Sequence, residues 1–372
     1  MRSPGRIGER IIVFVTIAIS ILASAPWLEA EESGDPSPLG VKEGSIIVTD
    51  SVGRSVEVPG SVKRIGCLYA FTGHAATMLG RCQDIVAISN GLRRDSLLHE
   101  ICPNILKALV PKAQGAINLE ELVRAELDLL FLSGDIGRDK AEMEKLASLK
   151  IPFLIVDYTS IEEQQRAVEM VGMAIGARDM AAKYVRYYQA CVDRVRSVTD
   201  TIPDSQRLRL YHSVNEANRT TIKEGLTTDW LKVEGIKNVA LTQSTTPLEG
   251  RNFVSMEQIL LWNPDVILVN EPNVIRYILQ DKQWTPIKAV KEDRVYQMPI
   301  GISRWGHPGS IETPLAILWT AKKLYPEHFQ DMDMFFETKK FYGDFFRYEL
   351  TDDMVNRILS GKLKRKPKKM SD

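Results

Sequence analysis

The side chains best suited to binding chemistry gather in one irregular stretch of the chain, residues 301–310, which contains Arg304, Trp305 and His307. Glycine and proline recur through this stretch and interrupt any helical or strand periodicity. Guanidinium, indole and imidazole groups bind ligands by bidentate hydrogen bonding, stacking and metal coordination. The stretch therefore predicts a ligand-binding loop. The alternative is structural, with Trp305 as a hydrophobic plug and His307 as the cap of the helix that follows.

Of two more histidines, His212 ends a predicted strand and His74 begins a predicted helix after a strand. Imidazole is the commonest side-chain ligand of transition metals, so these two and His307 are candidate metal ligands. Bare-ion sites generally add a carboxylate or a thiolate, and a bare ion would leave the nearby arginines and aromatic side chains unexplained. We therefore rank an organic metal complex above a bare ion, with one histidine able to supply an additional ligand to the bound complex.

The remaining candidates are aromatic or basic side chains that follow predicted strands. Open α/β sheets bind ligands in the crevice beyond the carboxyl ends of their strands. Aromatic faces cover apolar ligand surface, and arginine recognises carboxylates and stacks on planar groups. In addition to the three histidines and residues 304 and 305, the candidates are Tyr69, Phe71, Arg93, Tyr158 and Arg219. This mixture suits a large, partly anionic metal chelate or macrocycle.

Short apolar runs alternate with amphipathic stretches in both halves of the chain. After a predicted hairpin at residues 45–58, the first half contains strand candidates at residues 64–68, 85–88, 127–132 and 153–156. The second half contains strand candidates at residues 208–212, 266–269 and 294–297. This alternation is typical of parallel sheets covered by helices. The predicted fold class is α/β, with two Rossmann-like lobes that each hold a central, mostly parallel sheet.

The segment between the lobes predicts a stiff connection. We place the N-terminal lobe at residues 31–160, the connection at residues 161–202 and the C-terminal lobe at residues 203–360. Apolar spacing predicts one or two consecutive helices here, with a break at Gly176. Because a helix closes its hydrogen bonds internally, a long interlobe helix is rigid, and the lobes are expected to move little.

The two ends of the chain differ from the body. Arg2, Arg6 and Arg10 precede an apolar run and small-residue cleavage sites, the layout of a signal peptide in residues 1–30. The apolar run is about 15 residues, shorter than the roughly 20 that span a bilayer, which favours cleavage over a retained anchor. Residues 361–372 predict a disordered basic tail, with a membrane-surface role as the alternative. The mature protein is therefore expected in the periplasm.

Composition excludes several classes of protein. The 372 residues include 48 Lys and Arg against 48 Asp and Glu, with 44% hydrophobic residues, typical of a globular protein. A disordered chain and a nucleic-acid binder with a large basic excess are both excluded. The two basic ends, which hold nine Lys and Arg against three Asp and Glu, leave a net charge of −6 for residues 31–360. The body is therefore acidic.

The four cysteines are too few for a disulfide-rich scaffold and lack metal-binding spacing. In an oxidising compartment, Cys82 and Cys102, which flank one short segment, are the candidate disulfide pair. Cys67 lies in an apolar, strand-like run and Cys191 in a helical stretch, so both are predicted to be core residues.

Three segments resemble the solute-binding proteins of iron-chelate and cobalamin ABC importers. The first runs through residues 49–54 and 58–65, the second through residues 117–130, and the third through residues 255–267. The second and third share one design, in which a short helix with an early glutamate leads into a buried strand. The resemblance covers almost all of the predicted mature chain. It implies two lobes, a ligand between them, and delivery to an ABC permease.

Glu120 and Glu257 occupy the early position of these two helices. A carboxylate in the first turn of a helix is favoured by the helix dipole, so a purely structural role is the alternative. In the resembled family, the matching pair docks on arginines of the permease. By that resemblance, Glu120 and Glu257 are expected to recognise the permease.

The expected function is capture of a metal chelate, most readily an iron–siderophore complex, by a monomer that holds no permanent cofactor. Haem, a corrinoid such as cobalamin, and nickel or zinc complexes are the alternatives. The chain contains no P-loop, no dinucleotide-binding motif and no H-E-x-x-H, so catalysis is not expected. A periplasmic hydrolase that uses Ser303 and His307 is the remote alternative.

Overall fold

The structure is a computed structural model that describes residues 44–113, 116–221, 225–242, 246–248 and 251–363. The predicted signal peptide and most of the predicted basic tail lie outside these residues. In the described part of the chain, no helix is both long enough and apolar enough to cross a membrane.

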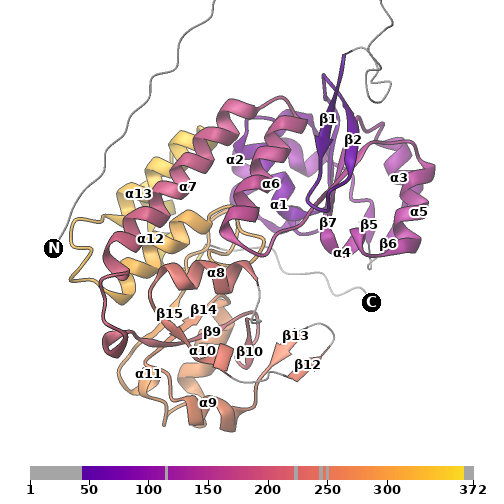
Figure 1. Ribbon diagram of the computed structural model, residues 1–372. Coiled ribbons are helices and arrows are strands. Elements are labelled where there is room, and N and C mark those ends of the chain that lie inside the picture. Colours follow the sequence, from indigo (N-terminus) through magenta and orange to yellow (C-terminus); the bar gives the residue numbers. More distant parts are fainter. Residues whose placement is uncertain (1–43, 114–115, 222–224, 243–245, 249–250, 364–372) are drawn as a thin grey trace, which may run out of the picture. The chain divides into compact units, whose positions relative to one another are not determined.

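The N-terminal lobe is built around a four-stranded parallel sheet (Figure 1). Its strands, in spatial order, are β4 (Ile85–Ile88), β3 (Ile65–Cys67), β7 (Leu129–Ser133) and β8 (Phe153–Val156). The antiparallel hairpin β1 (Ser45–Thr49) and β2 (Ser55–Pro59) precedes the sheet. Asp50 is buried in the hairpin turn, where its carboxylate accepts hydrogen bonds from the backbone N–H of Arg54 at 2.9 Å and of Ile155 at 3.1 Å. This one side chain therefore both shapes the turn and attaches the hairpin to β8.

The C-terminal lobe contains a second four-stranded parallel sheet. Its spatial order is β11 (Lys237–Asn238), β9 (Arg209–Ser213), β14 (Val266–Val269) and β15 (Val295–Gln297). In both sheets the spatial order is second, first, third and fourth strand along the chain. The change of direction between the first and third strands is the switch point where doubly wound sheets bind ligands.

Smaller antiparallel pairings complete the strands. They are β5 (Lys112–Ala113) with β6 (Ala116–Ile117), and β13 (Arg251–Phe253) with both β10 (Arg219–Thr220) and β12 (Thr246–Leu248).

The connection between the sheets is a pair of helices, α6 (Ile161–Ala174) and α7 (Arg178–Thr199). The break falls where the sequence predicts it, because Gly176 adopts a φ of +70°, a conformation that costs glycine little. Gly172 allows close packing, since a Cβ there would lie 2.5 Å from the Cβ of Ala181. Helix α7 also packs against α12 (Thr313–Leu324), and Figure 1 shows these two helices side by side.

The remaining helices pack against the two sheets, against α12 or against one another. In the N-terminal lobe they are α1 (Ala70–Met78), α2 (Ser96–Ile101), α3 (Leu119–Arg124), α4 (Gly134–Gly137) and α5 (Lys140–Ser148), with 3₁₀ turns η1 (Cys82–Asp84), η2 (Leu92–Arg94) and η3 (Pro103–Lys107). After α7 they are the 3₁₀ turn η4 (Asp204–Gln206), α8 (Leu226–Val233), the 3₁₀ turn η5 (Val239–Thr242), α9 (Met256–Trp262), α10 (Pro272–Gln280), α11 (Lys288–Lys291), α13 (Met334–Phe341), the π-helix η6 (Tyr342–Phe346) and α14 (Asp352–Leu359).

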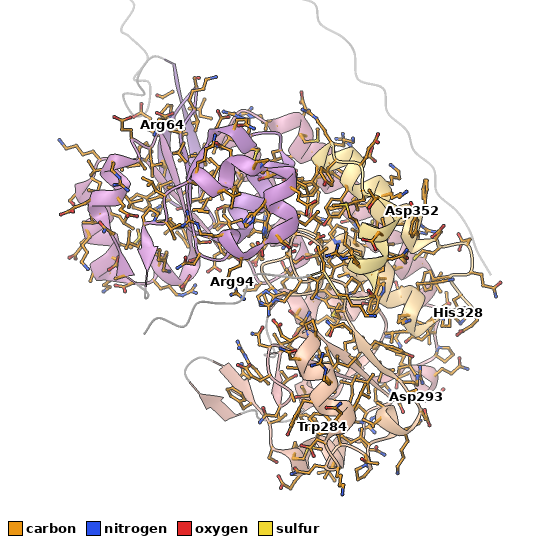
Figure 2. The ribbon with its side chains drawn as sticks, turned by 180° about the vertical axis from the view of Figure 1, so that it is seen from behind. Arg64, Arg94, Trp284, Asp293, His328 and Asp352 are labelled. Atoms are coloured by element: carbon orange, nitrogen blue, oxygen red, sulfur yellow. A yellow bond between two sulfur atoms is a disulfide. The ribbon has the colours of Figure 1, made fainter. Side chains whose placement is uncertain are left out.

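One hydrophobic core is shared by both lobes. Alternate strand residues such as Phe131 and Leu268 join it together with Tyr184 and Tyr188 of α7. The other face of each sheet has a core of its own, which contains Leu130 in the N-terminal lobe and Trp284 in the C-terminal lobe (Figure 2). The two-residue period of a strand explains this division, because neighbouring side chains point to opposite faces.

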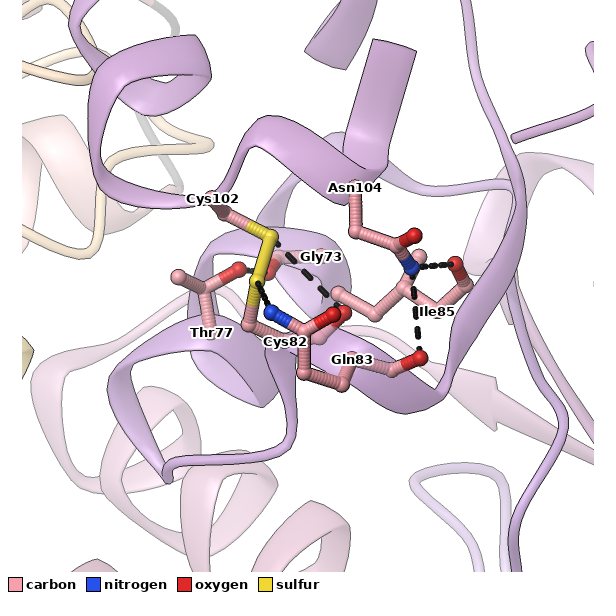
Figure 3. Close-up of a disulfide and its surroundings, with 7 residues drawn as sticks. All are labelled: Gly73, Thr77, Cys82, Gln83, Ile85, Cys102 and Asn104. Carbon is pink, nitrogen blue, oxygen red and sulfur yellow. Dashed lines mark hydrogen bonds between the residues drawn. A yellow bond between two sulfur atoms is a disulfide. The ribbon is translucent and has the colours of Figure 1, made fainter. Parts of the chain in front are cut away.

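Cys82 and Cys102 form a disulfide, the pair that the sequence predicts (Figure 3). Beside it, the Asn104 side-chain amide donates hydrogen bonds to the carbonyl oxygens of Gln83 and Ile85, both at 3.2 Å. The bridge and the amide together hold η1 against η3. Cys67 and Cys191 are free and buried, and burial raises the pKa of each thiol to about 12.

We predict that Cys82→Ser combined with Cys102→Ser lowers the free energy of unfolding by about 3 kcal/mol, because the unfolded chain loses the constraint of a loop of this size. Urea unfolding of the oxidised wild type and of the double variant measures the difference. Dithiothreitol should destabilise only the wild type. A double variant as stable as the oxidised wild type would contradict the prediction.

Candidate functional site

Three aromatic side chains from the N-terminal lobe meet at the carboxyl edge of its sheet. Tyr69 caps the start of α1 after β3, Phe71 lies in the first turn, and Tyr158 follows β8. The ring centroids of Phe71 and Tyr158 are 4.9 Å apart, and the Tyr69 hydroxyl donates to the Tyr158 hydroxyl at 3.0 Å. Three residues predicted to bind ligand therefore form one cluster, with Phe71 buried and both tyrosines partly buried.

The predicted binding loop of the C-terminal lobe approaches this cluster. A Cβ on Gly309 would lie 3.8 Å from the Tyr69 hydroxyl oxygen and 3.9 Å from His307 Nδ1.

Burial raises the pKa of Tyr69 to about 12 and raises the pKa of Tyr158 well above its usual value. Both phenols are therefore neutral at physiological pH and present hydroxyl groups rather than charges.

A buried carboxyl group shapes the loop from within. Glu312 is fully buried and accepts hydrogen bonds from the Tyr342 hydroxyl, the Ser303 backbone N–H at 2.8 Å and the Ser303 hydroxyl at 2.7 Å. The Ser310 hydroxyl lies 2.7 Å from that of Ser303. Gly301 is required at this point, since a Cβ there would lie 1.9 Å from a Glu312 carboxyl oxygen.

The interlobe helices hold the same loop from outside. Gln164 of α6 donates to the Ser310 carbonyl oxygen at 3.0 Å, and Tyr184 of α7 donates to the Ile311 carbonyl oxygen at 2.6 Å. The Tyr188 hydroxyl in turn donates to the Gln164 side chain at 3.0 Å. Sequence reasoning did not find these positioning residues. The one local sequence signal for this arrangement is Glu312 itself, which directly precedes α12, a helix whose second residue is Pro314.

Arg304 and Trp305 are held by neighbours in their own lobe. The Arg304 guanidinium donates to the Glu271 carboxylate and the Asn215 side chain, so its charge is already balanced. Trp305 is fully buried and belongs to the shared core. Its position matches the structural alternative, a plug beneath the loop, and a ligand role for Trp305 stays a prediction.

His74 and His212 lie in the cores of their lobes. His74 is 2% exposed, and its Nε2 lies 2.8 Å from the Asp95 carboxylate. His212 is fully buried against the edge of Trp230, and burial lowers its pKa to about 4 despite the nearby Asn270 amide. His212 is therefore neutral at physiological pH.

The structure does not gather His74, His212 and His307 into a metal site. Within the described ranges, no three His, Cys, Asp or Glu side chains form a group that could hold a metal ion. The reason is that His74 and His212 each point into a packed lobe interior. His307 differs from them, because it is partly exposed and its Nδ1 accepts a hydrogen bond from Gly309 N–H at 3.3 Å.

The other two predicted arginines donate hydrogen bonds to residues outside the loop. Arg93 is exposed and donates to the Ala108 carbonyl oxygen at 3.1 Å. Arg219, in β10, donates to the Glu216 carboxylate at 3.3 Å. Ser303, the nucleophile of the hydrolase alternative, is 6% exposed and donates its hydroxyl hydrogen to Glu312.

Glu120 and Glu257 occupy equivalent places in the two lobes. Each is exposed and is the second residue of a short helix, α3 or α9, which precedes the third strand of its sheet. Asn118 caps α3 and Ser255 caps α9, each accepting a backbone hydrogen bond at 3.2 Å. The helix start lowers the pKa of Glu257 through its own backbone N–H and the Ser255 hydroxyl. Both carboxylates are thus presented to solvent by matching elements.

Comparisons with known proteins agree with this architecture. Residues 90–300 match the family model described as periplasmic binding protein. The molybdate-binding protein MolA of Haemophilus influenzae is 24% identical over 339 residues, which cover 84% of this chain and 93% of MolA. A Bacillus subtilis ABC transporter substrate-binding lipoprotein, YvrC, is 22% identical and covers 77% of this chain and 87% of its own.

Solved structures share the fold. MolA bound to molybdate superimposes with a TM-score of 0.73 at 23% identity, covering 82% of this chain and 99% of MolA. Helicobacter pylori CeuE in a nickel–histidine complex has a TM-score of 0.68 at 22% identity, covering 85% of this chain and 99% of CeuE. At this level of identity the structures establish the fold and leave the ligand open.

We predict that Glu312→Gln changes how stability depends on pH. Burial raises the folded-state pKa of Glu312, and the hydrogen bonds donated to the carboxyl group partly offset this. The unfolded chain therefore releases this proton at lower pH than the folded protein does. Stability is highest below the unfolded pKa and falls as pH rises towards the folded pKa, by about 1.4 kcal/mol for each pH unit between the two.

Urea unfolding across this pH range measures the dependence. The decrease in the free energy of unfolding that Glu312 causes as pH rises should be absent from Glu312→Gln. It should be unchanged in Glu349→Gln, where the side chain is exposed. Equal pH profiles for the wild type and Glu312→Gln would contradict the prediction, whatever the absolute stability of the variant.

Proposed function

Because this chain belongs to the family of periplasmic binding proteins, we propose that it captures a metal-containing small molecule between its lobes and delivers it to an ABC importer permease. An organic chelate of iron, of the siderophore type, is the proposed cargo. We also propose that it acts in the periplasm, which the family and the predicted signal peptide support.

The observation that carries this proposal is the approach of Gly309, beside His307, to Tyr69, whose hydroxyl is hydrogen-bonded to that of Tyr158. The Tyr158 hydroxyl accepts a hydrogen bond from Tyr69 and keeps its own hydrogen to donate to an oxygen atom of a chelate. The rings of both tyrosines can cover apolar ligand surface. His307 adds an imidazole from the opposite lobe, which can donate a hydrogen bond or supply a ligand to the metal. The cluster and the loop lie at the carboxyl edges of the sheets, where doubly wound folds bind small molecules.

Molybdate is the second candidate cargo. The similarity to MolA extends over most of both chains. The Tyr158 hydroxyl accepts from Tyr69 and keeps its own hydrogen, which suits an oxygen atom of an oxyanion. Arg304 adds no free positive charge in this structure, since Glu271 already balances it. Haem, corrinoid, and nickel or zinc complexes are the further cargoes to test.

Capture is proposed to involve a small closure of the lobes. The shared core and the hydrogen bonds from Gln164 and Tyr184 to the C-terminal loop connect the interlobe helices to the site. A large rotation would break these contacts. Binding is therefore expected to shift the site by a limited hinge motion.

We expect fluorescence and calorimetric titration to find one tight ligand among a ferric siderophore, haem, cobalamin, a nickel–histidine complex and molybdate. Tyr69→Phe and Tyr158→Phe should each weaken that ligand by roughly tenfold, because each variant loses a hydroxyl partner. Tyr277→Phe, a half-exposed tyrosine of α10, is the matched control and should bind normally.

Two results would argue against the proposal. If none of the five compounds binds, a metal-containing cargo is the wrong class. If one binds with equal affinity to all three tyrosine variants, the cargo lies elsewhere in the protein.

Glu120 and Glu257 are proposed to dock on cationic side chains of the permease. Glu120→Ala with Glu257→Ala should reduce delivery to the cognate permease in proteoliposomes by about tenfold or more, because charge complementarity governs association. Cargo affinity should not change. Glu144→Ala with Glu292→Ala removes the same charge from exposed positions, one in each lobe, and should deliver normally. Weakened cargo binding in the first variant would instead place Glu120 or Glu257 in the ligand site.

A further inference from the structure

A basic hollow lies at the amino-terminal edge of the first sheet, on the opposite side from the aromatic cluster. Its volume is about 200 Å³, and its wall contains three cationic side chains and no carboxylate. The lining residues are Arg64, Ile85, Val86, Asn104, Lys107, Ala108, Leu109, Arg124 and Ala125. Arg64 lines the hollow, and Arg94 lies in η2, beyond the carboxyl end of β4. Figure 2 shows these two residues towards opposite ends of the lobe, so the hollow is distant from the carboxyl edge.

Arg64 is fixed in place by the end of α3. Its Nε donates to the carbonyl oxygens of Ala125 and Glu126, both at 3.0 Å, and its Nη2 donates to Ala125 at 2.8 Å. These bonds use one side of the guanidinium and leave the Nη1 hydrogens for another acceptor. The charge of Arg64 is thus held rigidly, with capacity to bind an anion.

Lys107 and Arg124 add two solvent-exposed positive charges at the rim of the hollow. Both are exposed, and among the residues that the structure describes, Lys107 forms no ion pair within 4.0 Å. Arg124 approaches the Glu121 carboxylate only to 3.8 Å, and its side chain is 65% exposed. Exposed pairs of this kind are weak, so Arg124 is available to a stronger anionic partner.

Two exposed apolar side chains are the sequence neighbours of cations in the wall. Leu106, next to Lys107, is 48% exposed, and Val123, next to Arg124, is 57% exposed. Cations beside exposed apolar groups are the composition of surfaces that lie in the lipid headgroup region, where the cations meet phosphates and the apolar groups enter the acyl boundary. A free inorganic anion would use the cations but would gain nothing from Leu106 and Val123.

The hollow has a firm wall. The Cys82–Cys102 disulfide and the two hydrogen bonds of Asn104 hold η3, which carries Leu106 and Lys107, against η1 (Figure 3). The rim on the other side is α3, the helix that carries Glu120. A surface held in this way loses little conformational entropy when it binds.

We propose that this surface, formed by Arg64, Leu106, Lys107, Val123 and Arg124, binds the phosphate headgroups of anionic membrane lipids. The inference rests on the proposed function in one respect, because docking of Glu120 on a permease would bring α3 to the membrane. In this arrangement Glu120 contacts the permease, while Arg124, one turn further along α3, lies beside Arg64 and Lys107 of the same hollow and contacts the surrounding lipid.

Sedimentation with phosphatidylcholine vesicles, with and without phosphatidylglycerol, tests this binding. Binding should require the anionic lipid. Lys107→Gln with Arg124→Gln should weaken it by about 25-fold, or about fivefold for each charge. Leu106→Ser with Val123→Ser should weaken it by about tenfold. Arg276→Gln and Leu279→Ser, exposed positions of α10 in the other lobe, are the matched controls and should bind normally.

Three results would overturn the proposal. Equal losses in Arg276→Gln and in the hollow variants would mean diffuse charge attraction. Calorimetric binding of inorganic phosphate that needs Lys107 and Arg124, with no effect of the apolar variants on vesicle binding, would mean a site for free phosphate. Failure of the wild type to bind anionic vesicles would exclude the lipid. The predicted basic tail is present in every variant, so it cannot produce the differences.

The proposed function is tested separately in the same proteins. Cargo titration should be unchanged in all the hollow variants, because the hollow and the aromatic cluster lie at opposite edges of the sheet. If no cargo binds the wild type, the cargo proposal fails while the vesicle result stands on its own.

Discussion

The burial of Glu312 is the constraint on which the site depends. A carboxyl group without access to water must receive hydrogen bonds, and here the donors come from Ser303 and from Tyr342. These hydrogen bonds to the Glu312 carboxyl group bend residues 301–310 into a fixed loop. The same carboxyl group leaves no room for a side chain at Gly301. In the same loop Trp305 enters the core, and His307 and Tyr69 both lie within 4 Å of the position of a Cβ on Gly309. A hydrogen-bonding requirement inside the protein therefore determines which side chains of the loop are available to the proposed ligand.

The electrostatic character of the site follows from how its charges are matched. Arg304 and Arg219 are satisfied within the C-terminal lobe, by Glu271 and Glu216 respectively. The phenols of Tyr69 and Tyr158 remain neutral because they are buried. Selectivity in such a site depends on the direction of hydrogen bonds and on shape more than on net charge. This is consistent with a family whose members bind chemically different cargoes on one fold.

Much of the fold could be predicted from the sequence, because its signals are local. The strands at residues 85–88, 153–156 and 266–269 have the predicted bounds, since each is a short apolar run between turn signals. The helix break at Gly176 and the hairpin at residues 45–58 are also local signals. Strand β11 was not predicted, because it is two polar residues paired at a sheet edge. Burial of His74 and His212 could not be predicted either, since Asp95 and Trp230 are brought to them only by the folded chain.

The core that runs through both lobes has a consequence for how the protein folds. Residues of both sheets, both interlobe helices and α12 pack in one continuous cluster. Neither lobe can bury its own share of apolar surface without the other. The boundary near residue 160 therefore separates two sheets, but it does not separate two independent folding units. A cut in the chain there would expose hydrophobic surface on both fragments, and unfolding should occur as a single cooperative event. The backbone forms two lobes, but the described chain is expected to fold and unfold as one unit.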